Sequence, residues 1–135
     1  MKNLIQYHRP ERMGYGVDEI GGPPFSILTS VANGNPIGDR VWLVGRTSDL
    51  SSDVFISYCF IVDDVVAANH PEFLYRYVGE TGTEFDEMPK ISDAAWYPKL
   101  LKMTGNFNFG LTTITQDEIV SGLVEAADKE GYKVG

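Results

Sequence analysis

Residues 54–66 (VFISYCFIVDDVV) form the most apolar run in the chain, and they constrain the fold more than any other segment. β-Branched and aromatic residues fall on both faces of this run, which is typical of a strand that is covered on both sides. Strict alternation would place Ser57 and Cys59 on one face, and Ile56 and Tyr58 on the other. The segment therefore predicts a central strand in a sheet.

Shorter extended segments surround this central strand. Asp63 and Asp64 predict a bend or bulge near its end, and clusters of glycine and proline separate it from the other elements. The loop over residues 11–24 is long for a compact domain, and such loops are often functional. The other expected strands span residues 3–8, 25–31, 40–46 and 73–78, with shorter extended pieces at 88–91 and 107–111.

Two helices are expected after the strands. Ser92 is a suitable N-cap for a helix over residues 93–103, which Pro98 would shorten or break. Thr115 and Glu118 have capping-box spacing ahead of a single apolar stripe, which predicts a closing helix at the end of the chain.

These elements predict one α+β domain over residues 1–135. We expect a small, curved, mainly antiparallel β-barrel or sheet with flanking helices, including a C-terminal helix. The length of 135 residues is enough for one hydrophobic core without metals or disulfides, and the chain has a single cysteine.

The formal net charge of −8 is unevenly distributed along the chain. Residues 1–50 carry five basic and five acidic side chains, whereas residues 51–135 carry six basic and fourteen acidic ones. This balance argues against a broad basic face that coats nucleic acid, and it favours local recognition by the first 50 residues. With no apolar run of about 20 residues and no signal-peptide core, we expect no membrane partner and a cytoplasmic location.

The sequence offers little catalytic chemistry. Cys59 lies within the most apolar run, so we expect a buried, inert thiol. His8 and His70 have no metal-ligand spacing to Cys59 or to each other, and both are expected at the surface or in loops. Asp63 and Asp64 are adjacent, and neighbouring side chains on a strand point to opposite faces. We therefore expect no catalytic residue, no metal and no cofactor.

The third strand carries the positive signal for ligand binding. Residues 38–46 (GDRVWLVGR) predict a turn that leads into a strand, and alternation places Trp42 on one face with Arg40 and Arg46. If the aliphatic side chains on the opposite face point into the core, Trp42 needs cover or contacts a ligand. The loop with Tyr15 could provide that cover, as could the terminal helices, which would bury the ring.

Residues 38–44 (GDRVWLV), followed by residues 58–65 (YCFIVDDV), resemble PUA-like domains, and among these the EVE branch, relatives of the YTH and ASCH domains. Those domains often have a Gly-Asp turn before an alternating strand, and then a long strand that ends near an acidic residue. Residues 105–111 (GNFNFGL) are similar to the ends of small domains found with HNH nucleases.

The resemblance implies a module that binds RNA or DNA and holds a modified or flipped base among aromatic rings. Stacking would hold the base, and polar groups would read its edge. In this hypothesis Trp42 and Tyr58 stack, Tyr15 forms a lid, Ser30 and Asn33 supply polar contacts, and Arg40 and Arg46 contact phosphate.

Two other functions stay open. The acidic later part of the chain suits a protein-interaction module for basic partners, such as a partner subunit or a phage-encoded inhibitor. A small hydrolase on an ASCH-like scaffold would need a convergent lysine, threonine and carboxylate, for which Lys90, Thr112 and Glu118 are available.

Overall fold

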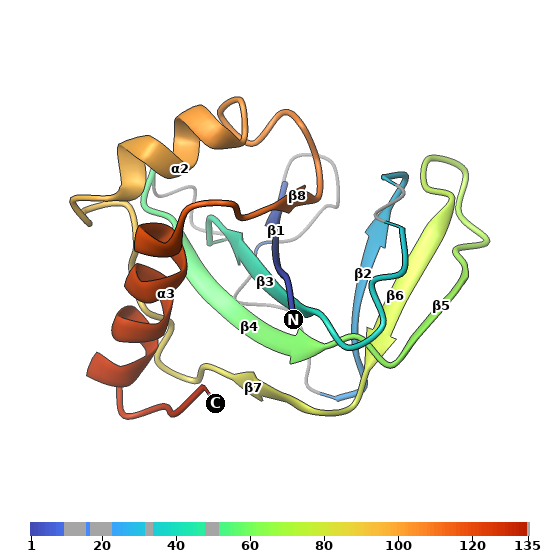
Figure 1. Ribbon diagram of the computed structural model, residues 1–135, viewed down its shortest axis with the longest axis horizontal. Coiled ribbons are helices and arrows are strands. Elements are labelled where there is room, and N and C mark those ends of the chain that lie inside the picture. The colour runs from blue at the N-terminus through green and yellow to red at the C-terminus, as the bar shows by residue number, and fades with distance from the viewer. Residues whose placement is uncertain (10–15, 17–22, 32–33, 48–51, 135) are drawn as a thin grey trace.

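The computed structural model describes residues 1–9, 16, 23–31, 34–47 and 52–134. The described strands form two sheets, and two helices pack beside the larger one (Figure 1). The strands are β1 (Asn3–His8), β2 (Phe25–Thr29), β3 (Arg40–Gly45), β4 (Phe55–Ile61), β5 (Asp64–Ala67), β6 (Tyr75–Gly79), β7 (Gly82–Glu84) and β8 (Thr112–Thr113). The larger sheet, sheet A, has the strand order β7-β4-β3-β1-β8, and the smaller, sheet B, has the order β2-β6-β5.

The central-strand prediction is confirmed, but the apolar run does not stay in one sheet. β4 pairs antiparallel with β3 on one side and with β7 on the other. At Asp63 the chain turns a corner and continues as β5 in sheet B. The Asp63 N–H donates to the carbonyl oxygen of Val78 at 2.8 Å, and its carboxylate accepts the Glu80 N–H at 2.9 Å. The bend predicted at this position is therefore the point where the strand changes sheets.

A β-bulge in β4 changes the face that its first half presents. Leu43 of β3 pairs with Tyr58, but the next residue, Val44, pairs with Ile56, so Ser57 is the extra residue. Ile56 consequently packs on the same side as Cys59, and Tyr58 packs on the other. The expectation that Ile56 and Tyr58 share a face is wrong, because the bulge breaks the period of two.

Sheet A is buried on both faces. Val41 and Leu43 of β3 join a core that lies between the two sheets. Trp42 and Val44 join a second core on the opposite face, together with residues of both helices. The alternation predicted for β3 is thus confirmed, and each of its faces is apolar.

The fold is a mixed α+β arrangement with a C-terminal helix, as expected. The strand pairs are antiparallel except for β1 with β3, and the described strands form two sheets without closing into a barrel. In the part of the chain that the structure describes, neither helix has the length and apolar character needed to cross a membrane.

The helices differ in detail from their expected ends. Helix α2 (Tyr97–Met103) is short, and Pro98 lies in its first turn, where a missing N–H breaks no helical hydrogen bond. Helix α3 (Asp117–Lys129) begins after Gln116, which makes no side-chain capping bond. Thr115 therefore does not cap this helix, and the expected capping box is absent.

Gly122 in the middle of α3 tests how closely the helices pack. A Cβ atom at this position would lie 2.2 Å from Trp96 Nε1. Alanine normally favours a helix over glycine by about 1 kcal/mol. Here we expect Gly122→Ala to lower the free energy of unfolding by about 1–3 kcal/mol, because the indole must move.

Urea denaturation measures this effect. The exposed neighbour Ser121 provides the control, since Ser121→Ala should change stability by less than about 0.5 kcal/mol. A stabilised Gly122→Ala variant would show that Trp96 leaves this position without cost.

Candidate ligand-binding site

Trp42 lies fully inside the helix-side core. Its exposed fraction is 0%, and its indole Nε1–H donates to Asn3 Oδ1 at 3.0 Å. The ring therefore has both packing neighbours and a partner for its one polar group. The sequence left open whether Trp42 contacts a ligand or is covered by the terminal helices. In the structure the helices cover the ring. A base could stack on Trp42 only if those helices moved away.

Tyr58 lies on the opposite face of sheet A from Trp42, in the core between the sheets. Its ring packs against Phe25, with centroids 5.0 Å apart, and against Phe60 at 5.9 Å. Its hydroxyl donates to the carbonyl oxygen of Ser26. Trp42 and Tyr58 thus do not line a common cavity, because the sheet itself separates them.

The remaining sequence candidates are dispersed. Arg40 begins β3 and Arg46 follows its end, so an extended chain separates their Cα atoms by about 20 Å. The two arginines therefore lie at opposite ends of the strand. Ser30 tethers the end of β2, since its hydroxyl lies 3.3 Å from both the Glu72 carbonyl oxygen and the Leu74 N–H nitrogen. Tyr15 and Asn33 lie outside the described residues.

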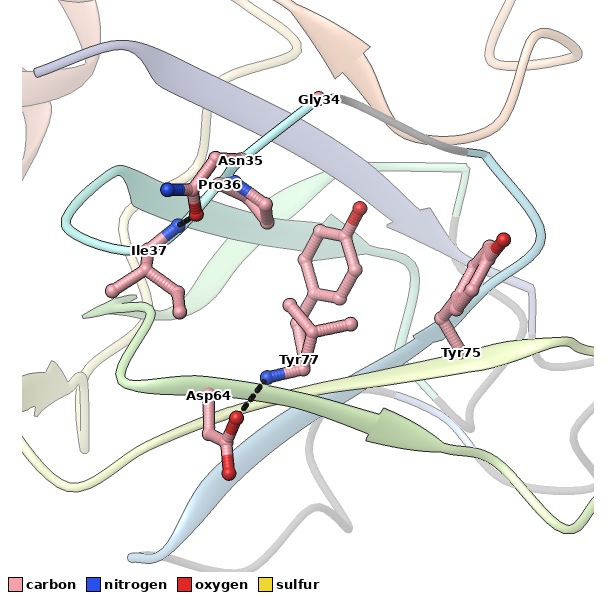
Figure 2. A pocket seen from close by; sticks show the side chains of 8 residues that line it. Gly34, Asn35, Pro36, Ile37, Asp64, Tyr75 and Tyr77 are labelled. Carbon is pink, nitrogen blue, oxygen red and sulfur yellow. Dashed lines mark hydrogen bonds between the residues drawn. The ribbon is translucent and has the colours of Figure 1, made fainter.

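One open pocket of about 350 Å³ lies beside sheet B (Figure 2). Two tyrosines of β6, Tyr75 and Tyr77, contribute rings to its wall, and the segment 34–37 that leads into β3 closes another side. The residues that line it are Gly34, Asn35, Pro36, Ile37, Asp64, Val65, Tyr75 and Tyr77. This site combines aromatic rings and aliphatic side chains.

The tyrosines differ in how firmly they are held. Tyr77 is 2% exposed, and its hydroxyl donates to the carbonyl oxygen of Val31 at 3.1 Å. Tyr75 is half-buried and packs against the inter-sheet core, so part of its ring remains accessible. Tyr77 therefore forms a fixed wall, and Tyr75 offers ring surface to a ligand.

Asn35 and Asp64 also line the pocket, but their polar ends point away from the tyrosine rings (Figure 2). Asn35 Oδ1 accepts the Ile37 N–H at 3.2 Å, which fixes the orientation of the amide. Asp64 Oδ1 accepts the Val65 N–H at 2.8 Å. Because Val65 is the partner of Tyr77 across β5 and β6, its side chain lies on the face of the rings, and the Asp64 carboxylate lies on the other face of sheet B.

Only part of the pocket lining can be predicted from the sequence. Alternation in the strand segment FLYRYV places Tyr75 and Tyr77 on one face, and the structure confirms that both line one pocket. Nothing in the sequence pairs this strand with the turn at Asn35 and Pro36, which lies about 40 residues earlier. That contact comes from the strand change at Asp63.

The proposed hydrolase residues do not form one group. Lys90 lies 2.8 Å from Asp93 and 3.7 Å from Asp53, and the Asp93 hydrogen bond raises the pKa of the lysine, which keeps it protonated. Glu118 pairs instead with Lys99. Lys90 and Glu118 thus belong to separate ion pairs.

The histidine and cysteine expectations have mixed outcomes. His8 is buried at the end of β1, so its expected surface position is wrong, whereas His70 lies in a loop and accepts the Glu72 N–H. Among the residues that the structure describes, no group of His, Cys, Asp and Glu could hold a metal ion. Cys59 is buried, and burial raises the pKa of its thiol to about 11.

No family model matches this chain, and neither the curated proteins nor the solved structures include a match. The pocket must therefore be interpreted from its own chemistry.

Cys59 makes stability depend on pH in the alkaline range. Between pH 9.0 and about 11 the thiol ionises in the unfolded chain but stays protonated in the fold. The unfolded state then binds fewer protons, so stability is full below pH 9.0 and falls as the pH rises towards 11. The loss attributable to this thiol should be about 2 kcal/mol.

Urea unfolding of the wild type and of Cys59→Ala at both ends of this range measures the difference. Tyrosine ionisation affects both proteins equally and cancels. Identical pH dependence in the two proteins would contradict the burial of this thiol as a protonated group.

Proposed function

We propose that this chain is a non-catalytic binding module that captures one nucleobase, modified or unmodified, in the pocket between Tyr75, Tyr77 and segment 34–37. The observation that carries the proposal is the open hollow of about 350 Å³, with two tyrosine rings at its wall. A volume near the lower end of ordinary ligand sites suits a single planar ring system. The resemblance to PUA-like domains agrees with this class of ligand.

The lining holds a base by its faces rather than by its edge. Tyr75, Tyr77 and the aliphatic side chains supply flat and apolar surface, whereas the polar ends of Asn35 and Asp64 point away from the rings. We therefore propose that the module accepts more than one kind of base.

Stacking accounts for this tolerance. Contact between a base and an aromatic ring stabilises a complex by about 1–3 kcal/mol. Such a contact tolerates any base, because every base has a flat face.

Replacing the accessible ring tests the capture of a base. Tyr75→Ala should abolish measurable binding of adenosine and cytidine, because it removes the stacking surface. Tyr75→Phe keeps the ring and should bind within about twofold of the wild type. Saturation-transfer NMR with the free nucleosides measures both variants, and the far-ultraviolet CD spectrum checks their fold.

If no nucleoside binds the wild-type protein, the proposal is wrong. It is equally wrong if Tyr75→Ala and Tyr75→Phe behave alike, since the ring would then have no role.

A second candidate is the acidic interaction module, which one observation favours. β7 is an outer strand of sheet A, and exposed carboxylates lie in and just after it, at Glu84, Asp86 and Glu87. An outer strand with acidic neighbours could pair with an extended basic segment of another protein. Salt-sensitive binding of a lysine-rich peptide, lost in Glu84→Lys but retained in Tyr75→Ala, would support this function instead of base capture.

A further inference from the structure

The turn between α2 and β8 is held rigidly although it is exposed. Thr104 is 1% exposed, and its hydroxyl donates to the Leu100 carbonyl oxygen at 2.9 Å. The same hydroxyl accepts the Phe107 N–H at 3.1 Å. Arg9 then fastens the turn from β1, since its Nη2 lies 2.9 Å from both the Phe107 carbonyl oxygen and Asn108 Oδ1.

The backbone of this turn adopts a conformation that needs such support. Gly105, Asn106 and Phe107 have φ angles of 59°, 56° and 65°, in the left-handed region. A residue as bulky as Phe107 rarely adopts a positive φ, and it does so only where surrounding contacts enforce it. Here the ring of Phe107 is stacked on Tyr7, with centroids 4.7 Å apart and planes inclined by 16°. The turn is therefore built to hold one shape.

That shape presents the ring of Phe109 to solvent. The side chain is 65% exposed, which is unusual for an aromatic residue on a well-anchored turn. One side of the ring lies against Gly105, because a Cβ atom there would be only 2.6 Å from ring carbons of Phe109. The backbone thus supports the ring, and its exposed surface is a preformed platform for stacking.

The Phe109 turn adjoins the base pocket through Val31. A Cβ atom on Gly110, the residue after Phe109, would lie 3.4 Å from Val31 Cγ2. The carbonyl oxygen of Val31 accepts the hydroxyl of Tyr77, whose ring lines the pocket. Pocket and turn therefore share one supporting residue, although their aromatic residues lie more than 30 positions apart in the sequence.

The chain around the turn is free of acidic residues. None occurs between Asp93 and Asp117 in a chain of net charge −8. That stretch contains Lys102, and Arg9 contacts the turn. A ligand with its base in the pocket and an anionic backbone therefore fits best with its phosphates towards the turn.

We propose that the exposed ring of Phe109 stacks the nucleotide that flanks the base held in the pocket, so that the ligand is a single-stranded nucleic acid rather than a free nucleoside. This inference rests on the proposed function of the pocket. It adds a second aromatic contact and a backbone contact, which together make binding stronger for an oligonucleotide and sensitive to salt.

The test compares free adenosine with a short fluorescein-labelled oligoadenylate, using NMR for the first and fluorescence anisotropy for the second. Oligoadenylate should bind the wild type more tightly than adenosine does, and only its affinity should fall as salt rises. Phe109→Ala should weaken oligoadenylate binding by about five- to tenfold and leave adenosine binding unchanged, while Phe109→Trp should retain both. Leu74→Ala is the matched control, because Leu74 is also 65% exposed but is aliphatic, and it should change neither.

The outcomes separate the two proposals. If adenosine binds but oligoadenylate binds no more tightly, or if Phe109→Ala leaves oligoadenylate binding unchanged, the flanking contact is wrong and the pocket proposal stands. If adenosine does not bind at all, the pocket proposal itself fails. Self-association that sedimentation detects in the wild type and not in Phe109→Ala would assign the ring to a second copy of the chain and overturn the inference.

Discussion

Burial of both faces of the β3–β4 pair is the requirement on which the remaining structure depends. Val41 and Leu43 point to one side of sheet A, and Trp42 and Val44 to the other, so that neither face can be left in water. Each buried aliphatic or aromatic side chain stabilises the fold by about 1.5–3 kcal/mol. One face is covered by the helices and the other by sheet B. A chain of this length has little further apolar surface to spare, which leaves the pocket as an open hollow at the margin.

The corner at Asp63 decides where that hollow lies. If residues 54–66 had continued as one strand, β5 would have extended sheet A and sheet B would have lost its outer strand. Because the chain changes sheets here, β5 pairs with β6 and brings Val65 beside the two tyrosines. The same corner anchors segment 34–37 from the other side, since the Gly38 N–H donates to the carbonyl oxygen of Val62 at 2.9 Å. The pocket is thus a consequence of the strand change.

The period of two predicted most of the strands and the two faces of β3, because local alternation survives folding when both faces are buried. It did not predict the bulge at Ser57. That bulge depends on how β4 pairs with Leu43 and Val44 of β3, and the residue types in β4 do not indicate it. The candidate site was harder. Trp42 stood out in the sequence between two arginines, yet large aromatic side chains more often fill a core than bind a ligand. The sequence alone could not show that two helices, which begin 55 and 75 residues later, cover it.

Charge counted along the chain does not describe the charge at a surface. It favours the first 50 residues, where basic and acidic side chains balance, over the strongly acidic remainder, and the pocket takes its segment 34–37 from the first part and its tyrosines from the second. Charges in solution influence one another over only about 8 Å at physiological ionic strength. The potential at a site therefore depends on which segments the fold brings together. Here the acid-free stretch before Asp117 lies against Val31 beside the pocket, through Gly110. A protein of net charge −8 can in this way carry a small surface that tolerates phosphate.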